Sequence, residues 1–413
     1  MGRGGFCFGC YPSLRLSPHS FFAGREGKNV GRIHKPGECR AWMVGFAILL
    51  FALLLSFEVS VGAREQHTQL KPDEQIVFFP TISQRVAGKD EWRIEIRGCV
   101  FEPEKRRIML AVLHESLELK HVEMTAAERT IFDERSRLFL VDHERGKRIF
   151  VRIENRVFPL SKSQTDGDFS GQIALTDREI VGLRKTDKNK DQRLRFVAEL
   201  PPGDTRKFAG ETILLNETGL SVISDIDDTI KVTQVTDRRV MVRNTFLRLF
   251  AAVPGMATFY QDIVRSNHAA FHYVSASPWQ LYDPLSEFIR SNGFPTGDFA
   301  LKEFRWKNKT FLSLFADPER YKRAVIEPLL KRFPNRRFIL IGDSGERDPE
   351  IYAALARNYP RQIERIVIRD VTGEPRTAPR YEKVFRGLPP ERWQIFISPP
   401  DLGASFEPDR GTP

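Results

Sequence analysis

Cysteine is scarce in this chain, with four residues of this type among 413. Cys7, Cys10 and Cys39 lie near the N-terminus, and Cys99 is alone in the rest of the sequence. This distribution provides no disulfide framework, and the Cys7–Cys10 pair lacks the second pair that a zinc site would need. Internal repeats and low-complexity blocks are also missing, so the length predicts a globular chain of about two domains.

A large excess of charge of either sign is missing too. The chain has 64 Lys and Arg residues against 54 Asp and Glu residues, which gives a formal net charge of +10. This mild excess favours approach to an anionic surface or substrate. It is too weak to indicate a nucleic-acid partner, and we predict none.

Only one long apolar run is present, and it lies near the N-terminus. Basic residues precede residues 42–57, which are apolar almost throughout, and small residues follow at Val61 and Ala63. A basic flank, an apolar core and a small-x-small ending describe an export signal, with Met43 as an alternative start. The run is shorter than the roughly 20 residues of a typical spanning helix, but long enough for an uncleaved anchor. We therefore expect residues 1–63 to direct export to the periplasm or the exterior, or to anchor the protein in a membrane.

Alternating apolar and polar residues dominate between residues 76 and 218. Trp92, Ile94 and Ile96 alternate with charged residues, and the same spacing recurs at residues 149–153. A period of two predicts half-buried strands. We predict a small, mostly antiparallel β-rich domain over residues 76–218, with one helical insert near residues 115–137.

From residue 219 onward, short and nearly continuous apolar runs alternate with helical segments. The runs are residues 220–224, 269–277, 336–344 and 363–371. Strands of this kind are buried on both faces, which predicts an α/β domain with a parallel sheet over residues 219–397. Residues 398–413 are rich in Pro, Gly and Asp and are predicted to form a flexible tail.

Polar residues follow three of these runs, at the strand ends where open α/β sheets bind ligands. They are Asp225, Asp227 and Thr229 after the first run, Ser275 at the end of the second, and Asp343 and Asp348 at the third. Lys322 is expected near the start of the helix before the third run. Asp225 and Asp227 are two residues apart on extended chain, so both carboxylates can face one ligand.

These residue types suit phosphoryl transfer with a metal. Crowded carboxylates raise one another's pKa unless a divalent cation neutralises them, and hard oxygen ligands suit Mg²⁺. One carboxylate could attack phosphorus while the other exchanges a proton with the leaving oxygen. Ser275 and Lys322 would then hold the phosphoryl oxygens.

Several of these residues have structural alternatives. The acidic run could be a solvated turn, and Asp228 could be a turn residue or the partner of a nearby base. Ser275 or Ser277 could cap a helix, and Asp348 could do the same for the helix that follows it.

The choice of Lys322 also has rivals along the same helix. Arg320, Arg323 and Lys331 are close in sequence and carry the same charge. Pro328 falls inside this helix and is expected to kink it. A position near the start of the helix favours Lys322 because it fits the family resemblance described below.

The segment from residue 221 to residue 371 resembles a known family. Asp-x-Asp-x-Thr after one strand, a Ser after the second, a Lys on a helix and Gly-Asp-x-x-x-x-Asp after the third resemble the haloacid dehalogenase superfamily. The stretches "SVISDIDDTIKVTQV", "FHYVSASPWQLYDPLSEFI", "GFPTG" and "FILIGDSGERDPEIY" resemble the magnesium-dependent phosphatidate phosphatase family of the yeast actin-patch type. Residues 146–175 fit the β-rich region of that family more loosely.

The resemblance implies a fold and roles for the two leading carboxylates. It implies a Rossmann-like parallel sheet with helices on both faces and a minimal cap. Asp225 would be the nucleophile that forms an aspartyl-phosphate, and its carboxylate would also touch Mg²⁺. Asp227 would be the general acid and base, with its backbone carbonyl on the metal.

The resemblance implies roles for the other residues as well. Ser275 and Lys322 would bind the phosphoryl group, and Thr229 would complete the substrate site by orienting Asp227. Asp343 would be the acidic metal ligand, and Asp348 a further ligand or a support for one.

The leading hypothesis is therefore a Mg²⁺-dependent phosphatidate phosphatase that meets a phospholipid substrate or a membrane surface. The sequence leaves two alternatives open. The same chemistry could act on a soluble or protein-bound phosphomonoester, or the protein could be a catalytically idle membrane-associated scaffold.

Overall fold

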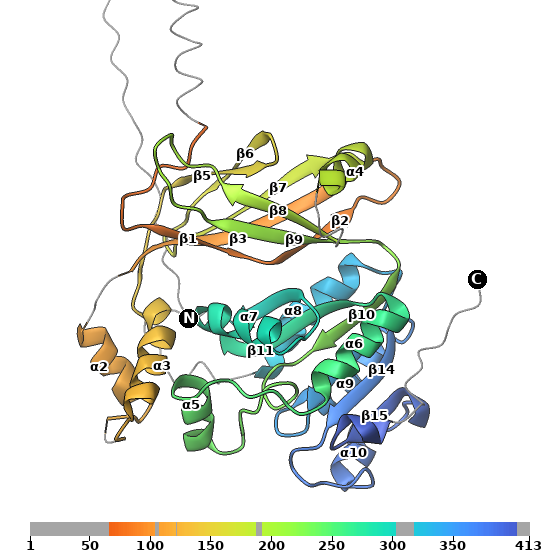
Figure 1. The fold of residues 1–413 in the computed structure, drawn as a ribbon. Helices are drawn as coiled ribbons and strands as arrows, with labels where there is room; N and C mark the ends of the chain where they lie inside the picture. The colour runs from red at the N-terminus through yellow and green to blue at the C-terminus, as the bar shows by residue number, and fades with distance from the viewer. Residues whose placement is uncertain (1–65, 104–106, 121, 187–191, 303–317, 403–413) are drawn as a thin grey trace, which may run out of the picture. The chain divides into compact units, whose positions relative to one another are not determined.

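The computed structural model describes residues 66–402, apart from residues 104–106, 121, 187–191 and 303–317 (Figure 1). The predicted leader, residues 1–63 with its apolar run at 42–57, lies outside the described residues. Among the residues that are described, no helix combines the length and the apolar character needed to cross a membrane.

The first half of the described chain forms a nine-stranded sheet, sheet A, with the order β1-β3-β2-β9-β8-β5-β6, in which β4 and β7 also pair with β3. Its strands are β1 (Gln75–Phe79), β2 (Thr81–Arg85), β3 (Trp92–Glu102), β4 (Asp142–His143), β5 (Arg148–Ile153), β6 (Arg156–Lys162), β7 (Asp168–Leu175), β8 (Arg193–Ala198) and β9 (Ala209–Leu215). All pairs are antiparallel except β2 with β9. Ile94 and Ile96 are fully buried, so the alternating pattern correctly predicted a mostly antiparallel, β-rich region.

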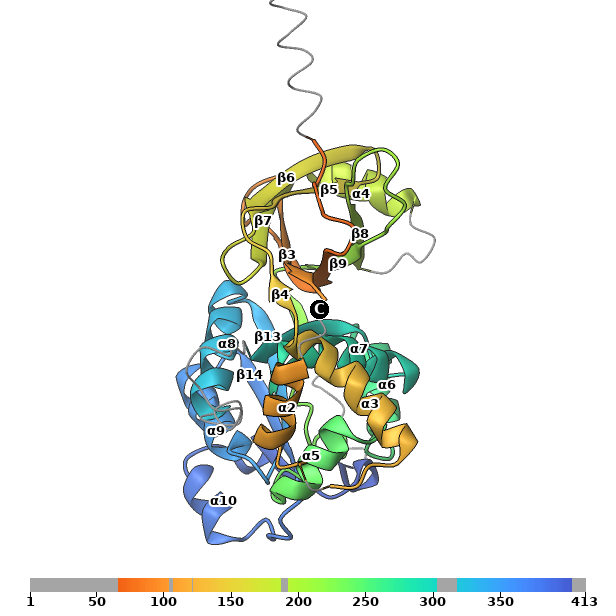
Figure 2. The ribbon, with the colours of Figure 1, turned by 90° about the vertical axis from the view of Figure 1, so that its left-hand side faces the viewer.

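The helical insert differs from the prediction because it contains two helices. They are α2 (Arg107–Ser116) and α3 (Ala126–Ser136). A capping box starts α3, since Thr125 and Glu128 bond each other's backbone N–H groups. A further helix, α4 (Asp177–Thr186), follows β7. Figures 1 and 2 both show α2 and α3 beside α5 of the second half.

The second half forms a six-stranded sheet, sheet B, with the order β12-β11-β10-β13-β14-β15. Its strands are β10 (Gly219–Ser224), β11 (Ala270–Pro278), β12 (Gly297–Lys302), β13 (Arg336–Asp343), β14 (Ile363–Arg369) and β15 (Trp393–Phe396). Every neighbouring pair is parallel. The four apolar runs of the sequence form β10, β11, β13 and β14, so the predicted parallel sheet is confirmed.

Helices cover both faces of sheet B. They are α5 (Arg238–Phe246), α6 (Met256–Asn267), α7 (Tyr282–Ser291), α8 (Pro318–Arg332), α9 (Asp348–Asn358) and α10 (Pro379–Val384). Adjacent residues of β10 pack in different hydrophobic clusters, one on each face of sheet B. Val222 packs in the cluster that contains Tyr260 of α6. Ile223 packs in the cluster of Ile326 on α8. Sheet B is thus the middle layer of an α/β arrangement.

Helix α8 contains Pro328 and continues through it to Arg332, and the kink expected there stays a prediction. Pro328 and Ala324 are both exposed, so water can hydrate the carbonyl that lacks a partner. The predicted tail starts later than residue 398, because Pro399–Leu402 forms a 3₁₀ helix. Leu402 is buried in the core of sheet B, and this contact holds the segment.

Candidate active site

Asp225 lies at the carboxyl end of β10, between the ends of β11 and β13. Its backbone N–H donates to the carbonyl of Ile341 at 2.9 Å, which extends the parallel ladder by one residue beyond the strand. The side chain is almost completely buried. The central strand therefore delivers this carboxylate to the edge where neighbouring strand ends meet.

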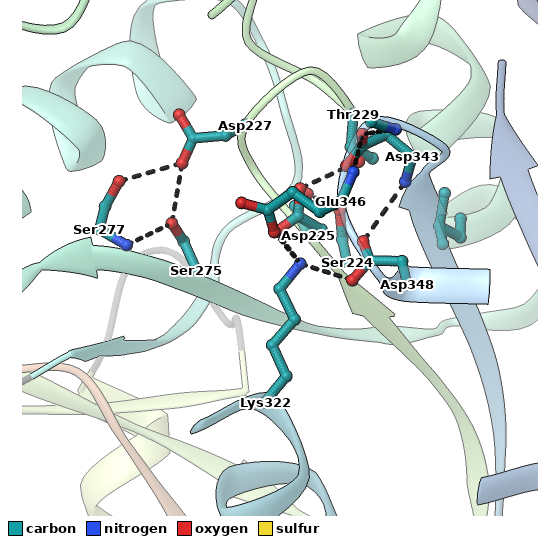
Figure 3. A network of polar contacts seen from close by, with 12 residues as sticks. Ser224, Asp225, Asp227, Thr229, Ser275, Ser277, Lys322, Asp343, Glu346 and Asp348 are labelled. Carbon is teal, nitrogen blue, oxygen red and sulfur yellow. Dashed lines mark hydrogen bonds and ion pairs between the residues drawn. The ribbon is translucent and has the colours of Figure 1, made fainter. Parts of the chain in front are cut away.

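The Lys322 ammonium joins three carboxylates at this edge (Figure 3). Lys322 Nζ lies 2.8 Å from Asp225 Oδ1, 2.9 Å from Glu346 Oε2 and 2.5 Å from Asp348 Oδ1. Burial alone would lower the pKa of Lys322, but Asp225 and Asp348 raise it well above its ordinary value. The amine thus stays positively charged without contact with solvent.

Asp343 leaves one oxygen available in the buried cluster. Its Oδ1 accepts the N–H groups of Gly345 at 2.6 Å and Glu346 at 3.2 Å. Its Oδ2 is buried and has no hydrogen-bond partner among the described residues. Such an atom is costly unless a cation or another donor meets it.

Asp348 is held against Asp343 by the geometry of β13. Asp348 Oδ2 accepts the backbone N–H of Asp343 at 3.3 Å. A Cβ atom on Gly342 would lie 2.2 Å from Asp348 Oδ2, so only glycine allows this approach. Asp348 starts α9 without capping it, since α9 has no side-chain cap hydrogen bond.

The acidic cluster is suited to a divalent cation. Asp225, Asp343 and Asp348 can each offer one oxygen, and these atoms all lie within 4.8 Å of one another. Burial is the main cause that raises the pKa of Asp225 and Asp343 well above the ordinary range, and that of Asp348 to about 6. A hard cation would reverse these shifts and would occupy the available oxygen of Asp343. These residues therefore fit a metal site.

Asp227 has a different set of partners. Its Oδ2 accepts the hydroxyls of Ser275 at 2.9 Å and Ser277 at 3.0 Å. Its Oδ1 lies 2.7 Å from Lys231 Nζ and accepts the Thr233 hydroxyl at 2.8 Å. Burial alone would raise the pKa of Asp227, but the Lys231 ammonium and the hydroxyl donors lower it to about 2. Asp227 is therefore an ionised carboxylate in this arrangement.

One expectation for this motif, the role of Thr229, is wrong. Figure 3 shows the Asp227 carboxylate directed toward Ser275 and Ser277, and that of Asp225 toward Lys322. Thr229 does not orient Asp227, because its hydroxyl donates to Asp225 Oδ2 at 3.1 Å. The strand alternation ends at Ser224, and a tight turn follows it.

Asp228 organises that turn. Its backbone has a φ of 55°, in the left-handed region. Its carboxylate accepts the N–H groups of Thr233 at 2.8 Å, Gln234 at 2.7 Å and Val235 at 2.7 Å. Asp228 was expected to be either a turn residue or the partner of a nearby base, and these contacts are those of a turn residue.

Sequence reasoning missed three residues of the site. Lys231 and Thr233 contact Asp227, and Glu346 contacts Lys322. Lys231 is four residues after Asp227, and this spacing could have indicated an ion pair between them. Of the rivals of Lys322, Arg323 pairs with Glu327 instead.

Comparison with known proteins shows which family this part of the chain is similar to. Residues 220–370 match the family described as the catalytic domain of phosphatidate phosphatase APP1. Over these residues the chain is similar to an APP1-type catalytic domain. This match supports the family resemblance, and its residues include Asp225, Ser275, Lys322 and Asp348.

Two curated relatives share more of the chain than the APP1-type domain alone. Phosphatidate phosphatase APP1 of Saccharomyces cerevisiae is 30% identical over 273 residues, which cover 64% of this chain and 45% of that protein. An uncharacterized protein of Schizosaccharomyces pombe is 32% identical over 202 residues, which cover 48% of this chain and 33% of that protein. The matched residues thus span less than half the length of either relative.

Proposed function

We propose that this protein is a phosphatidate phosphatase, which hydrolyses phosphatidate to diacylglycerol and phosphate. The observation that carries the proposal is the buried group of Asp225, Lys322, Asp343 and Asp348 within an APP1-type domain. The yeast relative is named for this activity. The fold we propose is that of the haloacid dehalogenase superfamily, Rossmann-like and with a minimal cap.

We propose Mg²⁺ as the cofactor. Asp225, Asp343 and Asp348 would hold it through their carboxylates, and Asp227 through its backbone carbonyl. When bound, the ion supplies positive charge that keeps these carboxylates ionised and offsets the negative charge of the phosphoryl group. The available oxygen of Asp343 supports this assignment.

In the first proposed step, an Asp225 oxygen attacks phosphorus. The bond between phosphorus and the glycerol oxygen breaks, an aspartyl-phosphate forms, and the leaving oxygen takes a proton from Asp227. In the second step, water attacks the aspartyl-phosphate, Asp227 takes a proton from the water, and phosphate leaves. Lys322 and Ser275 bind the phosphoryl oxygens.

The contacts of Asp227 make a specific demand on this mechanism. A carboxyl group whose pKa is about 2 is ionised near neutral pH and holds no proton to donate. Asp227 must therefore separate from Lys231, take up a proton from water and turn toward Asp225 before it protonates the leaving oxygen. Ser275, which bonds Asp227 here, becomes available to the phosphoryl group in the same movement.

Access and location follow from the same proposal. Between Thr229 and Ser275 the described residues form α5, α6 and the first part of β11, so we propose that no large cap domain in this stretch separates bulky substrates from the strand ends. We propose a phospholipid or membrane surface as the partner, with no nucleic acid. We also propose that residues 42–57 direct export or anchor the protein in the membrane.

The decisive experiment is phosphate release by the Asp225→Asn variant. An amide cannot act as the carboxylate nucleophile, so we expect no measurable hydrolysis of phosphatidate vesicles. Asp262→Asn, on the exposed side of α6, is the matched control and should keep full activity. Chelation by EDTA should also stop the wild-type enzyme, and Mg²⁺ should restore it. Full activity of Asp225→Asn would exclude the mechanism, and full activity in EDTA would exclude the metal.

The two alternatives are tested with the same protein. A panel of soluble and protein-bound phosphomonoesters, compared with phosphatidate, separates a lipid phosphatase from a phosphatase with another substrate. If no compound in the panel releases phosphate, the idle scaffold is the better description.

A further inference from the structure

The loop between β13 and α9, residues 344–347, fixes one oxygen of Asp343. Asp343 Oδ1 accepts the N–H groups of Gly345 at 2.6 Å and Glu346 at 3.2 Å. The loop lies close against this carboxylate, since a Cβ atom on Gly345 would be only 2.9 Å from Asp343 Oδ1. The other oxygen, Oδ2, has no hydrogen-bond partner among the described residues and remains available to a cation. The direction of Asp343 therefore depends on how this loop is held.

The Arg380 guanidinium holds the loop from α10. Its Nη1 donates to the Ser344 carbonyl at 2.7 Å, and its Nη2 donates to the Glu346 carbonyl at 2.8 Å. A guanidinium can meet two carbonyl groups at once because its N–H groups form a rigid planar fork. Arg380 thus binds the loop on both sides of Gly345.

A single peptide group connects Arg380 with Asp343. The Ser344 carbonyl and the Gly345 N–H belong to the same peptide unit, and a planar trans peptide directs these two groups to opposite sides. Arg380 donates to the carbonyl side, and the N–H side donates to Asp343 Oδ1. The positive charge at the carbonyl polarises the peptide and strengthens its hydrogen bond to the carboxylate. Because a rotation of this peptide would break both contacts, Arg380 opposes any reorientation of the group that holds Asp343.

Arg380 is itself held from two sides. Its Nε and Nη2 donate to the two carboxylate oxygens of Glu350 on α9, at 3.0 and 3.1 Å. Such a bidentate pair fixes the plane of the guanidinium. The neighbouring residue Tyr381 is fully buried and packs in the cluster that contains Tyr352 of α9. Both the backbone and the head group of Arg380 are therefore anchored to the helix that follows the loop.

We propose that Arg380 is a positioning residue that orients Asp343 toward the cation through the Ser344–Gly345 peptide. The inference rests on the proposed phosphatase function and its Mg²⁺ site. It adds a residue that lies beyond residues 220–370, the stretch that matches the family. Groups that support metal ligands without touching the metal typically account for about 10- to 100-fold in metal affinity.

Calorimetric titration of the full chain with Mg²⁺ alone tests the proposal. Arg380→Met removes the N–H donors and keeps a long side chain, and we expect it to weaken Mg²⁺ binding by about tenfold or more. Arg357→Met is the matched control, because the Arg357 guanidinium also donates to two backbone carbonyls, but to those of Val384 and Arg386. Its Mg²⁺ affinity should stay within about twofold of the wild type. Equal weakening in both variants, or none in Arg380→Met, would overturn the proposal.

Arg380→Lys keeps the proposal testable if Arg380→Met does not fold, which urea unfolding of each variant will show. A lysine retains the charge, but its single ammonium lacks the fork that spans both carbonyls. We expect Arg380→Lys to weaken Mg²⁺ binding by about three- to tenfold. Wild-type affinity in this variant would contradict the role of the fork.

Phosphate release from phosphatidate vesicles, measured separately, distinguishes this inference from the proposed function. If the substitutions at Arg380 weaken Mg²⁺ binding but the wild type hydrolyses no phosphatidate, the proposed function fails and the role of Arg380 stands. If the wild type hydrolyses phosphatidate and Arg380→Met binds Mg²⁺ as tightly as the wild type does, the function stands and the role of Arg380 fails. If the wild type binds no Mg²⁺, the inference fails together with the cofactor assignment.

Discussion

At the residue scale, the site places its carboxylates in two opposite electrostatic environments. Burial raises the pKa of Asp225 and Asp343 well above the ordinary range. Asp227 is also buried, but Lys231 and the hydroxyl groups of Thr233 and Ser275 hold its pKa at about 2. Environments that separate the pKa values of neighbouring acids are a common basis for dividing roles between them. Here these environments distinguish Asp225 and Asp343, whose charged forms a cation would stabilise, from Asp227, which pairs with the Lys231 ammonium.

The raised pKa of Asp348 predicts how the metal-free protein responds to pH. Its pKa is about 6 in the folded state and about 3.9 in an unfolded chain. Between these values the folded state binds more protons, so the free energy of unfolding falls as pH rises from about 4 to about 6. We expect the wild type to lose stability relative to Asp348→Asn across this window, measured by urea unfolding in EDTA.

Mg²⁺ should change this result in a defined direction. The cation binds the ionised carboxylates and not the protonated ones, so its stabilising effect should increase with pH. The wild type in saturating Mg²⁺ should therefore lose the decline in stability between about pH 4 and pH 6. An unchanged pH profile after addition of Mg²⁺, Mn²⁺ or Ca²⁺ would contradict a metal site at Asp348.

At the scale of elements, the turn after β10 positions more of the site than any other single segment. It carries Asp225 and Asp227 and returns Lys231 to within an ion pair of Asp227. The turn is itself held at both ends, because Val232 N–H donates to the Ala251 carbonyl at 2.8 Å. At the other end, Arg369 Nη1 donates to the Asp228 carbonyl. The position of both catalytic candidates thus depends on contacts that hold this turn in place, both within it and with Ala251 and Arg369.

Asp228 provides the test of that dependence. Asp228→Ala removes the acceptor of three backbone N–H groups, that of Thr233 among them buried, at a backbone with positive φ. We expect a loss of about 3 kcal/mol in the free energy of unfolding, measured by denaturant titration. Asp228→Asn should lose less, because asparagine tolerates left-handed backbone and keeps one acceptor oxygen. Asp262→Ala on the exposed side of α6 is the control, and an equal effect there would refute the role of Asp228.

At the scale of the whole molecule, the two halves of the described chain share their cores. Leu113 of α2 and Phe132 of α3 pack in the same cluster as Phe246 of α5. Arg135 of α3 donates to the Thr245 carbonyl at 2.5 Å and lies 3.8 Å from the centre of the Phe250 ring. The insert of the β-rich half therefore supports the helix that follows the catalytic turn.

This sharing predicts that residues 219–402 do not fold well alone. Removal of residues 1–218 would expose Met241 and Phe246, which the insert covers, and would remove Ile82 and Leu215 from the opposite core. We expect this fragment to unfold without a cooperative transition and to bind the dye ANS, as chains with exposed apolar surface do. A soluble fragment with a single cooperative transition would support two independent domains and contradict the expectation.

The division of the fold between sequence and tertiary structure follows from the range of the interactions involved. The apolar runs at β10, β11, β13 and β14 were readable because a strand buried on both faces leaves a local pattern. The motif at Asp225 and Asp343 was readable because parallel strand ends converge at one edge. Within the insert, α3 lies in the predicted range and α2 was missed, because the break between the two helices depends on local contacts such as the cap at Thr125.

The sequence by itself determined the parallel sheet and the residues that gather at its carboxyl edge. Only the tertiary structure decided which partner each of them takes. Asp227 bonds Ser277, which is 50 residues away, and Lys322 contacts Asp225 from α8. Side chains from distant segments compete for each carboxylate, and burial and distance decide between them once the chain is packed. The local sequence pattern therefore specifies where the acidic residues lie. Packing specifies which carboxylates pair with an ammonium group and which keep an oxygen without a partner among the described residues.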